Sequence, residues 1–352
     1  MNILVTGASG FVGTSLIPFL LEKGHSVTAQ IRSRDKLASA YSKKKDKEIN
    51  DNSDAGINPE EKKTTDDNEN PWNLNLSESK IRLFESGDIT PQTDWTGALK
   101  NIDVVIHLAQ RAHVMEERET DPLSVYRKIN VDSMKNLLGQ CVDANVKRFI
   151  FISSIKVNGE FTFNNPFSEV SQPAPEDPYG ISKLEAENLL KEICSRSKMD
   201  YVIIRPPLIY GPDVPANFKS LIRIVQKGIP LPFGGIKNQR SMIGISNLID
   251  FILFAAVKPE AAGNIFLISD GEDLSLPGLI QKIAAANSQK PPLFYFPVII
   301  LKILFFLISG NRLSRRLISS LQIDSSKAKT LGWNPPHTVD FDIRRAVESM
   351  SS

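Results

Sequence analysis

A tyrosine and a lysine four residues apart, in the stretch YGISK (Tyr179–Lys183), have the types and the spacing for proton chemistry. The stretch follows Pro178 and opens a predicted helix that runs to about Cys194, so both side chains lie on one helical face. A free tyrosine hydroxyl has a pKa of about 10, which is too high for easy proton exchange at neutral pH. A lysine ammonium one turn away favours the phenolate and lowers that pKa. Taken alone, however, this spacing is a common surface pairing.

A pair of serines supplies the third polar group. The buried run Arg148–Ile152 is predicted as a strand that delivers Ser153 and Ser154 to the carboxyl edge of a sheet. A serine hydroxyl at that edge can hydrogen-bond a substrate carbonyl or alcohol and orient it. Tyr179 would then donate or remove a proton while a nicotinamide carries the hydride.

The N-terminal stretch MNILVTGASGFVG predicts where such a cofactor binds. Asn2–Thr6 is a short apolar run bounded by glycine, which is typical of a buried strand. Gly7, Gly10 and Gly13 follow in G-x-x-G-x-x-G spacing, and a helix is predicted over Thr14–Lys23. Missing β-carbons let the backbone approach a diphosphate, and unpaired helix N–H groups face its negative charge. A plain glycine turn is the alternative, but the flanking strand and helix favour dinucleotide binding.

The end of the next predicted strand, Ser26–Ile31, bears on the choice between NAD and NADP. An acidic residue there would bind the ribose hydroxyls of NAD, and none is present. Arg32 or Arg34 could instead pair with the 2′-phosphate of NADP, although both could equally be solvated loop residues. We therefore expect NADP or NAD, with NADP favoured. Asp88, which follows the predicted strand Ile81–Glu85, lies where it could meet the adenine amine.

Strands alternate with helices along the chain, which is typical of a parallel, doubly wound sheet. Further strands are predicted over Asp103–Leu108, Arg148–Ile152 and Tyr201–Arg205, and a helix over Pro122–Ala144. The expected fold class is α/β, with a Rossmann-type NAD(P)-binding domain over residues 1–205. A smaller C-terminal substrate-binding domain is expected over residues 206–352, with elements that return to the first domain. Residues 35–79 are polar and interleave both signs of charge, so we expect a disordered insertion there.

The bulk properties exclude several classes of protein. The chain has 352 residues of ordinary globular composition, and its formal net charge of +2 gives no reason to expect a nucleic-acid partner. Cys141 and Cys194 lie in predicted helices without partner spacing, so we expect unpaired thiols in a reducing compartment. No metal site is expected. No signal peptide precedes the first strand, and we therefore expect a cytoplasmic protein.

Five motifs give the chain a resemblance to a known family. They are TGASGFVG (Thr6–Gly13), HLA (His107–Ala109), SSIKVNG (Ser153–Gly159), YGISK (Tyr179–Lys183) and IRPPLIYGP (Ile204–Pro212). In these motifs the chain resembles the extended short-chain dehydrogenase/reductases and, among them, the NAD-dependent epimerase/dehydratase group that acts on nucleotide sugars. The resemblance spans nearly the whole chain apart from the polar insertion. It implies catalytic roles for Ser154 (rather than Ser153), Tyr179 and Lys183.

The resemblance also implies a set of ligand contacts. The expected cofactor-binding residues are Gly7, Ser9, Gly10, Phe11, Val12, Gly13, Arg32, Asp88, Ile89, Leu108, Ala109, Tyr179 and Lys183. The expected substrate-binding residues are Ser154, Asn217 and Arg240, the last two at a nucleotide diphosphate. An arginine suits this role because its planar fork meets phosphate oxygens in pairs, although Arg240 could instead be an interdomain salt-bridge partner. The family also leads us to expect a homodimer.

Two departures from the family pattern narrow the reaction. Dehydratases of the family carry an Asp-Glu pair just after the serine, where this chain has Ile155 and Lys156, so dehydration is not expected. Sugar 4-epimerases usually end the second strand with an acidic residue, and they commonly have a tyrosine where Asn158 stands. The motifs SSIKVNGE and DPYGISKLEAE are most similar to those of bacterial 4-keto UDP-sugar reductases. These enzymes serve the synthesis of UDP-N-acetylquinovosamine and of surface polysaccharide. Relatives with these motifs are also called UDP-glucose 4-epimerases.

We therefore expect an NAD(P)-dependent reductase of a UDP-linked 2-acetamido-2,6-dideoxy-4-hexulose. Tyr179 would supply the proton, Lys183 would lower the pKa of that phenol, and Ser154 would hold the C4 oxygen. The nearest alternative is a UDP-glucose or UDP-N-acetylglucosamine 4-epimerase, which uses the same three residues and keeps its cofactor. A distant alternative is a non-catalytic NADP-binding sensor on the same fold.

The apolar segment Leu293–Ser309 allows two interpretations. A helix of about 13 residues from Pro297 would be ~20 Å long, short of a ~30 Å bilayer core, and Lys302 interrupts it. We first expect a buried helix of the smaller domain. The alternative is a helix on the membrane surface, with residues 293–316 as a peripheral contact at its inner face. LGWNPP (Leu331–Pro336) is expected to close the smaller domain.

Overall fold

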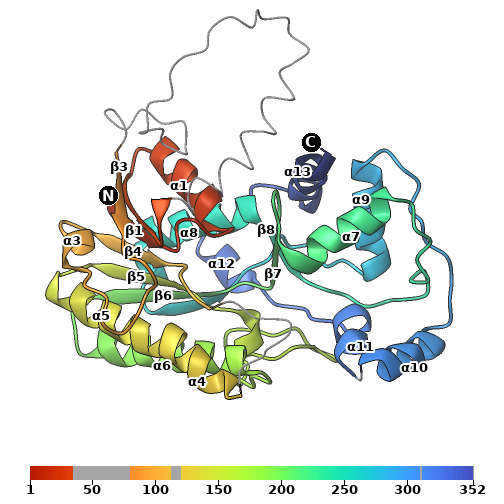
Figure 1. The fold of residues 1–352 in the computed structure, drawn as a ribbon, viewed down its shortest axis with the longest axis horizontal. Coiled ribbons are helices and arrows are strands. Elements are labelled where there is room, and N and C mark those ends of the chain that lie inside the picture. The colour runs from red at the N-terminus through yellow and green to blue at the C-terminus, as the bar shows by residue number, and fades with distance from the viewer. Residues whose placement is uncertain (35–79, 112–119, 310, 352) are drawn as a thin grey trace, which may run out of the picture.

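The computed structural model of the protein describes residues 1–34, 80–111, 120–309 and 311–351 (Figure 1). The predicted insertion over residues 35–79 lies outside the described residues. Seven strands of the described part form one parallel sheet in the order β3-β2-β1-β4-β5-β6-β9. They are β1 (Asn2–Thr6), β2 (Ser26–Ile31), β3 (Ile81–Glu85), β4 (Val104–His107), β5 (Arg148–Ile152), β6 (Asp200–Arg205) and β9 (Asn264–Leu267). The predicted Rossmann-type doubly wound sheet is confirmed.

The strand order creates a crevice between β1 and β4. From β1 the chain first builds outward through β2 to β3, and it then returns to the other side of β1 at β4. Connections therefore leave the carboxyl ends of these two strands in opposite directions, which is where open α/β sheets bind ligands. The register pairs Thr6 with His107, so the glycine loop and the segment after β4 start at the same level of the sheet.

Helices cover both faces of the sheet (Figure 1). Those on one face are α1 (Gly13–Glu22) and α8 (Ile245–Val257), and those on the other are α3 (Thr96–Leu99), α5 (Ser133–Asp143) and α6 (Pro178–Ser195). Every residue of β4 and β5 is buried, which explains why apolar residues run through these strands without alternating. Cys141 and Cys194 are buried free thiols, as predicted.

The helix predicted over Pro122–Ala144 is interrupted. It consists of α4 (Pro122–Arg127), a π-helical turn (Lys128–Asp132) and α5. In the π turn, the buried side chain of Asn130 accepts from the backbone N–H of Arg111 at 2.8 Å and donates to the hydroxyl of Ser182 at 3.1 Å. The wider turn thus places one amide between the segment after β4 and helix α6, a contact that hydrophobic periodicity does not reveal.

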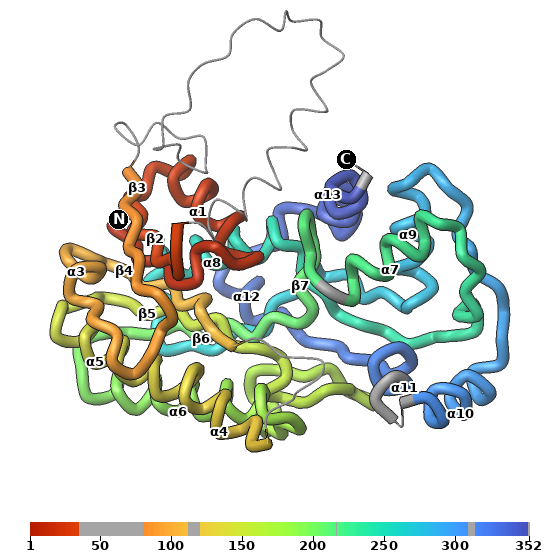
Figure 2. The backbone as a smooth tube through the Cα atoms, in the orientation of Figure 1, coloured from red at the N-terminus to blue at the C-terminus, as the bar shows by residue number. Residues whose placement is uncertain are grey.

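After β6 the chain builds a second apolar cluster, traced in green to blue in Figure 2. Its elements are β7 (Leu208–Tyr210), α7 (Ala216–Gln226), β8 (Met242–Gly244), α9 (Leu276–Ala286), α10 (Val298–Ser309), α11 (Asn311–Ile318) and α13 (Val339–Ser351). α8, β9 and α12 (Ser326–Thr330) return to the main sheet. Two short 3-10 turns also occur, η2 (Ile155–Val157) after β5 and η3 (Pro259–Ala261) after α8.

Two predictions for the C-terminal half are wrong. Trp333 of the LGWNPP motif does not close the smaller domain but packs on Phe251 of α8, with ring centroids 4.9 Å apart, in the core of the main sheet. Its indole N–H donates to Asp250 at 2.7 Å. The segment Leu293–Ser309 does not form a buried helix, because α10 exposes most of its apolar side chains. In the part of the chain that the structure describes, no helix is both long and apolar enough to cross a bilayer.

A buried ion pair fixes α6 against β6. Arg205 donates through Nε to Oε1 of Glu187 at 2.9 Å and through Nη2 to Oε2 at 2.6 Å, and both side chains are at most 2% exposed. The guanidinium also donates to Oδ1 of Asn158 at 3.0 Å, and the Ser153 hydroxyl donates to Oε1 of Glu187 at 2.6 Å. Removing two charges from water is costly, so a buried ion pair is stable only when further hydrogen bonds satisfy both side chains. Asn158 and Ser153 provide these hydrogen bonds here.

We expect Arg205→Leu to lower the free energy of unfolding by about 3–5 kcal/mol, because Glu187 would remain buried without its cation. Urea denaturation followed by circular dichroism measures the change. Arg196, whose guanidinium lies 3.2 Å from Glu192 in a solvent-exposed pair, provides the matched control. Arg196→Leu should leave the stability nearly unchanged, since exposed pairs contribute little. Similar losses in both variants would contradict this account of the buried pair.

Candidate active site

The glycine loop after β1 is shaped by close backbone contacts. Gly7 has φ +70°, and a Cβ on it would meet the backbone N of Ala109 at 2.9 Å. A Cβ on Gly13 would lie 2.6 Å from the carbonyl oxygens of both Gly7 and Ala8, so only glycine fits there. Helix α1 follows without a side-chain cap on its N-terminus. The loop therefore presents helix N–H groups to an anion, as a dinucleotide diphosphate requires.

Gln30, near the end of β2, holds this loop in place. Its Oε1 accepts from the backbone N–H of Gly7 at 2.8 Å, and its Nε2 donates to the Ser86 hydroxyl at 2.9 Å. Thr6 provides a second tie, because its hydroxyl accepts from the backbone N–H of Ala109 at 3.2 Å. The loop and both neighbouring strand ends are thus connected before any ligand binds.

The two residues predicted to meet the adenosine half of the cofactor are paired with each other. Nε of Arg32 lies 2.6 Å from Oδ1 of Asp88, and the side chains are 56% and 75% exposed. Arg34 lies farther from its partner, with Nε 3.9 Å from Oε2 of Glu85. The charge of Arg32, one of the two arginines on which the preference for NADP rests, is therefore already matched by a carboxylate.

Tyr179 and Lys183 meet through the side chain of Gln110. Nζ of Lys183 donates to Oε1 of Gln110 at 2.5 Å and to the carbonyl of Ile152 at 2.7 Å. The Tyr179 hydroxyl lies 3.5 Å from the same Gln110 oxygen, at the outer limit of a hydrogen bond. Nζ of Lys183 also lies 3.9 Å from the ring centroid of Phe151. The end of β5 and the segment after β4 therefore hold this lysine.

Burial controls the titration of these groups. Burial lowers the pKa of Lys183 to about 7, although the charge of Glu187 one turn away acts in the opposite direction. Burial also raises the pKa of the Tyr179 phenol, against hydrogen bonds with Ser154 and Gln110. Burial therefore dominates the titration of the phenol, and the expectation that Lys183 lowers its pKa stays a prediction. Burial and the nearby Lys183 cation together lower the pKa of His107 to about 3, so its ring is neutral at pH 7.

The structure separates the two serines. The Ser153 hydroxyl faces the buried Glu187 carboxylate, whereas the Ser154 hydroxyl accepts from the backbone N–H of Lys156 at 3.2 Å and hydrogen-bonds with Tyr179. Ser154 is therefore the serine on the tyrosine side, where the family motif puts the catalytic one. Its assignment, with those of Tyr179 and Lys183, stays a prediction about the reaction itself.

Other predicted ligand contacts lie in different surroundings. Arg240 is partly buried, and its Nη1 donates to the carbonyls of Ser319 at 3.1 Å and Arg316 at 3.4 Å. Burial lowers the pKa of Arg240. Asn217 is exposed near the start of α7. Their contact with a nucleotide diphosphate stays a prediction, as do the homodimer and the membrane contact. No cluster of three or more His, Cys, Asp or Glu side chains suited to a metal occurs among the described residues.

Four residues of the site have no role predicted from the sequence: Gln110, Gln30, Asn130 and Glu187. For Glu187 a signal existed, because it lies four residues after Lys183 and eight after Tyr179, on the same face of α6. For the three amides the sequence holds no comparable signal, since their partners lie on other elements of the sheet edge.

Comparisons with known proteins identify the family of the chain. The model of the NAD dependent epimerase/dehydratase family matches residues 3–269. A UDP-glucose 4-epimerase from Vibrio cholerae is 40% identical over 352 residues, which cover 99% of this chain and 95% of that protein. An N-acetyl-alpha-D-glucosaminyl-diphospho-ditrans,octacis-undecaprenol 4-epimerase from Escherichia coli O157:H7 is 25% identical, with 99% and 94% coverage.

Solved structures share the fold along the whole chain. A UDP-glucuronic acid 4-epimerase from Bacillus cereus in complex with NAD aligns with a TM-score of 0.73 at 21% identity, covering 100% of this chain and 99% of that one. A UDP-glucose 4-epimerase with UDP-glucose from Thermotoga maritima aligns with a TM-score of 0.70 at 22% identity and the same coverage. From its family match and its full-length relative, the chain is an enzyme of the NAD-dependent epimerase/dehydratase family.

Proposed function

We propose that the protein is an NAD-dependent 4-epimerase of a UDP-linked hexose. The observation that carries the proposal is the placement of the Tyr179 hydroxyl between Ser154 and the Gln110–Lys183 contact, at the sheet edge that also bears the glycine loop. The sequence motifs favour reduction of a 4-keto sugar. The full-length relative from Vibrio cholerae, named a UDP-glucose 4-epimerase, supports epimerisation instead. The buried, pKa-shifted lysine supports an enzyme over a non-catalytic sensor.

The described residues fit a dinucleotide. Glycine at positions 7 and 13 leaves a cradle that a Cβ would fill, and the uncapped N-terminus of α1 faces it. When bound, the nicotinamide ring supplies reversible hydride exchange at the sugar C4. Lys183 is held at the carboxyl edge of the sheet by Gln110 and the Ile152 carbonyl, where its cation can face that ring.

The chain's own residues would handle the proton. Tyr179 is suited to remove the proton from the C4 hydroxyl and to return it after the sugar has turned. Its hydroxyl lies beside Ser154 and Gln110, and its side chain is buried apart from 7% of its surface. Ser154 is suited to hold the same oxygen by a hydrogen bond. Lys183, with its pKa of about 7, can charge when an anion or phenolate forms beside it.

We propose NAD rather than NADP as the working cofactor. Oδ1 of Asp88 lies 2.6 Å from Nε of Arg32. A 2′-phosphate would therefore have to compete with this carboxylate for the guanidinium. Two solved structures of the same fold are complexes with NAD. The sequence favoured NADP through Arg32 or Arg34, and both of these arginines lie near a carboxylate in the structure.

A second candidate concerns the carrier of the sugar rather than the chemistry. The Escherichia coli O157:H7 relative is named for a sugar attached to a polyprenyl diphosphate, and α10 exposes an apolar face on the substrate side of this chain. A diphosphate-linked hexose is common to both carriers. UDP-N-acetylglucosamine and undecaprenyl-diphosphate N-acetylglucosamine, offered in parallel, separate the two candidates by which one is converted.

The test of the proposed function is incubation of the purified protein with UDP-glucose and with UDP-N-acetylglucosamine, without added reduced cofactor. We expect conversion to the corresponding 4-epimers, read by chromatography, with no net change in nicotinamide absorbance. Stoichiometric oxidation of added NADH or NADPH by a 4-keto UDP-sugar, without epimerisation, would contradict the proposal and restore the reductase.

Tyr179→Phe should lower kcat by about 10²–10⁴-fold, because it removes the proton-transferring hydroxyl while keeping the ring. Cofactor content and the unfolding midpoint should remain near wild type. Tyr201→Phe, at the start of β6 and away from the crevice, is the matched control and should retain full activity. An active Tyr179→Phe protein would exclude this residue as the acid and base.

Asp88→Asn should shift the preference toward NADP, by roughly fivefold in the ratio of the two dissociation constants, since it frees the Arg32 guanidinium for a 2′-phosphate. Isothermal titration with NAD and NADP measures both constants. The control is Glu85→Gln, which changes the looser partner of Arg34 and should leave the ratio unchanged. An unchanged ratio in Asp88→Asn would show that the ion pair does not govern cofactor choice.

A further inference from the structure

Helix α10 presents an apolar surface that nothing in the described chain covers. Seven of its apolar side chains are 42–75% exposed: Ile299, Ile300, Ile303, Leu304, Phe306, Leu307 and Ile308. Phe294 and Tyr295, just before the helix, are also exposed. We call these nine residues the docking face. Single exposed apolar residues are ordinary, but a contiguous set of this size marks a contact with a partner or a membrane.

The helix is apolar on all sides but packs on one only. Val298, Leu301 and Phe305, spaced three and four residues apart, point into the second apolar cluster. Its other residues are apolar as well, apart from the exposed Lys302 and the terminal Ser309. With 12 residues, α10 is about 18 Å long, which is too short to span a bilayer core but long enough to lie in its surface.

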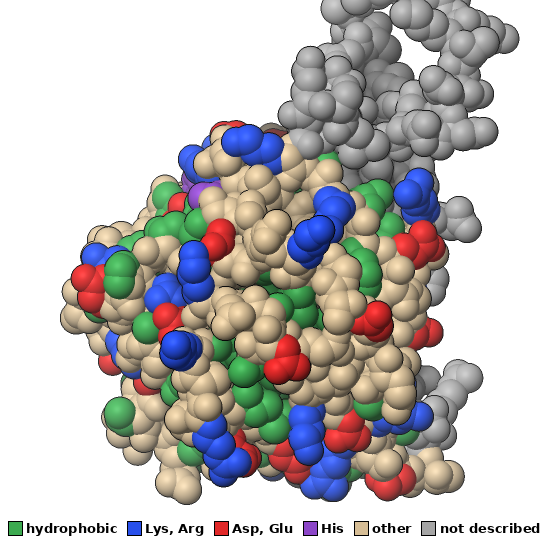
Figure 3. Space-filling view, turned by 90° about the vertical axis from the view of Figure 1, so that its left-hand side faces the viewer, with side chains coloured by type: hydrophobic (Ala, Val, Ile, Leu, Met, Phe, Trp, Pro, Cys, Tyr) green, Lys and Arg blue, Asp and Glu red, His purple; other side chains and the backbone are tan. Residues whose placement is uncertain are grey.

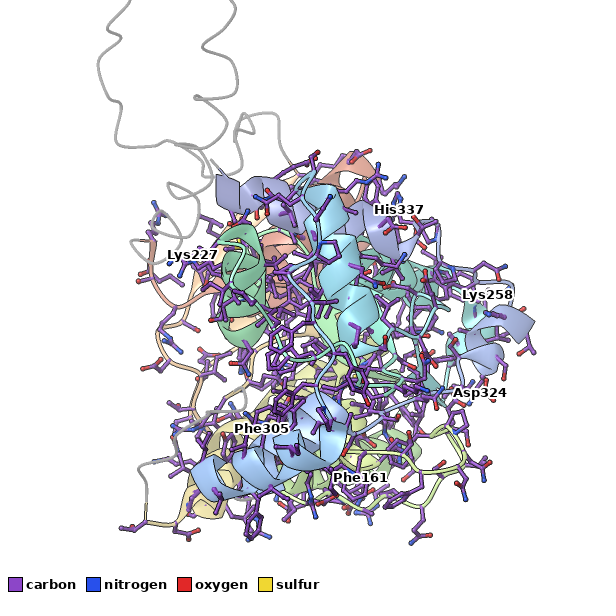
Figure 4. The ribbon with its side chains drawn as sticks, turned by 90° about the vertical axis from the view of Figure 1, so that its right-hand side faces the viewer. Phe161, Lys227, Lys258, Phe305, Asp324 and His337 are labelled. Carbon is purple, nitrogen blue, oxygen red and sulfur yellow. The ribbon has the colours of Figure 1, made fainter. Side chains whose placement is uncertain are left out.

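An aromatic pair outside α10 lies against α11, the helix that packs beside α10. Phe163 is 85% exposed and packs edge-to-face on Phe161, with ring centroids 5.1 Å apart. The guanidinium of Arg315 in α11 lies 4.9 Å from the ring centroid of Phe161. Figure 4 shows Phe161 and Phe305 at the same end of the molecule, with Lys258 and His337 away from it. Aromatic and basic side chains thus lie beside the apolar helix.

The sequence around the docking face carries charge of one sign only. Residues 274–323 contain three lysines and three arginines and no acidic residue. The opposite side of the molecule, in Figure 3, instead mixes basic and acidic side chains. Two of these cations meet carboxylates from outside the segment, Lys282 at Asp340 and Arg315 at Glu176, whereas Lys302 is exposed within the docking face itself. An apolar helix that carries an exposed lysine within a basic segment is complementary to a surface that is apolar below and negatively charged above.

We propose that the docking face inserts into the headgroup region of an anionic lipid bilayer and holds the enzyme at the membrane surface. A second copy of the chain is the weaker occupant, because a two-fold contact would set two basic segments against each other. The proposal does not depend on which sugar carrier the enzyme uses, since it rests on α10 and its surroundings alone.

Helix α11, which follows the docking face, contacts two segments that carry predicted site residues: the start of α6 and Arg240. Arg315 of α11 pairs with Glu176 at 2.6 Å, and Glu176 directly precedes Asp177, the N-cap residue of α6. The carbonyls of Arg316 and Ser319, at the end of α11, accept from Arg240. Membrane docking would therefore set the substrate half of the molecule, rather than the glycine loop, against the lipid.

The test is sedimentation of the full chain with vesicles of phosphatidylcholine alone and of phosphatidylcholine and phosphatidylglycerol in equal parts. We expect binding to the anionic vesicles that weakens with added salt, and little binding to the neutral ones. Ile303→Glu/Leu307→Glu should weaken binding at least about tenfold, and Lys302→Gln roughly fivefold. Epimerase activity on a soluble UDP-sugar should be unchanged in both variants.

Val257→Glu/Phe341→Glu is the matched control, because both side chains are exposed and apolar. Val257 directly precedes Lys258 and Phe341 stacks on His337, and Figure 4 places Lys258 and His337 away from Phe305 of α10. It should bind vesicles as wild type does. Absence of binding by the wild-type chain, or equal binding by the Ile303→Glu/Leu307→Glu variant, would overturn the proposal. Analytical ultracentrifugation tests the second copy as occupant. If the wild type does not bind vesicles and the Ile303→Glu/Leu307→Glu variant changes its oligomeric state, the face belongs to a second copy and the proposal is overturned.

Discussion

The buried ammonium of Lys183 is the interaction on which the arrangement of the site depends. It is fully enclosed, and its described hydrogen-bond acceptors are two neutral oxygens, the Ile152 carbonyl and the Gln110 amide. An enclosed cation without a carboxylate in contact is costly in its charged form, which is why its pKa falls to about 7. The fold must therefore hold the acceptors rigidly, and it does so from two different strands.

Several polar contacts serve this requirement. Glu187, one turn beyond Lys183, is fixed by Arg205 and Ser153, so α6 cannot rotate without breaking a buried ion pair. Asn130 ties the same helix to the segment that carries Gln110. Tyr179 is positioned as a consequence, because it lies on the face of α6 that these contacts orient toward the sheet edge. Proton chemistry and fold stability thus use one network.

The sequence predicted what local spacing determines. The glycines of the first loop and the one-turn spacing of Tyr179 and Lys183 are properties of a few consecutive residues, and both correspond to the observed geometry. Contacts between distant segments could not be predicted in this way. The partners of Arg32 and Lys183 lie on other strands, and the burial of Trp333 against the main sheet depends on where the chain returns. The exposure of α10 likewise depends on what packs beside it, whereas its composition alone resembles a core helix.

The protonation of Lys183 can be measured directly by NMR titration of the protein with ¹³C-labelled lysine, using Lys183→Met to assign the signal. The account predicts one lysine signal in the ligand-free protein that titrates near pH 7 and is missing from the variant. If Lys183 instead titrates with the exposed lysines, at about 10.4, its ammonium is not enclosed as described and the proposed chemistry of the site fails.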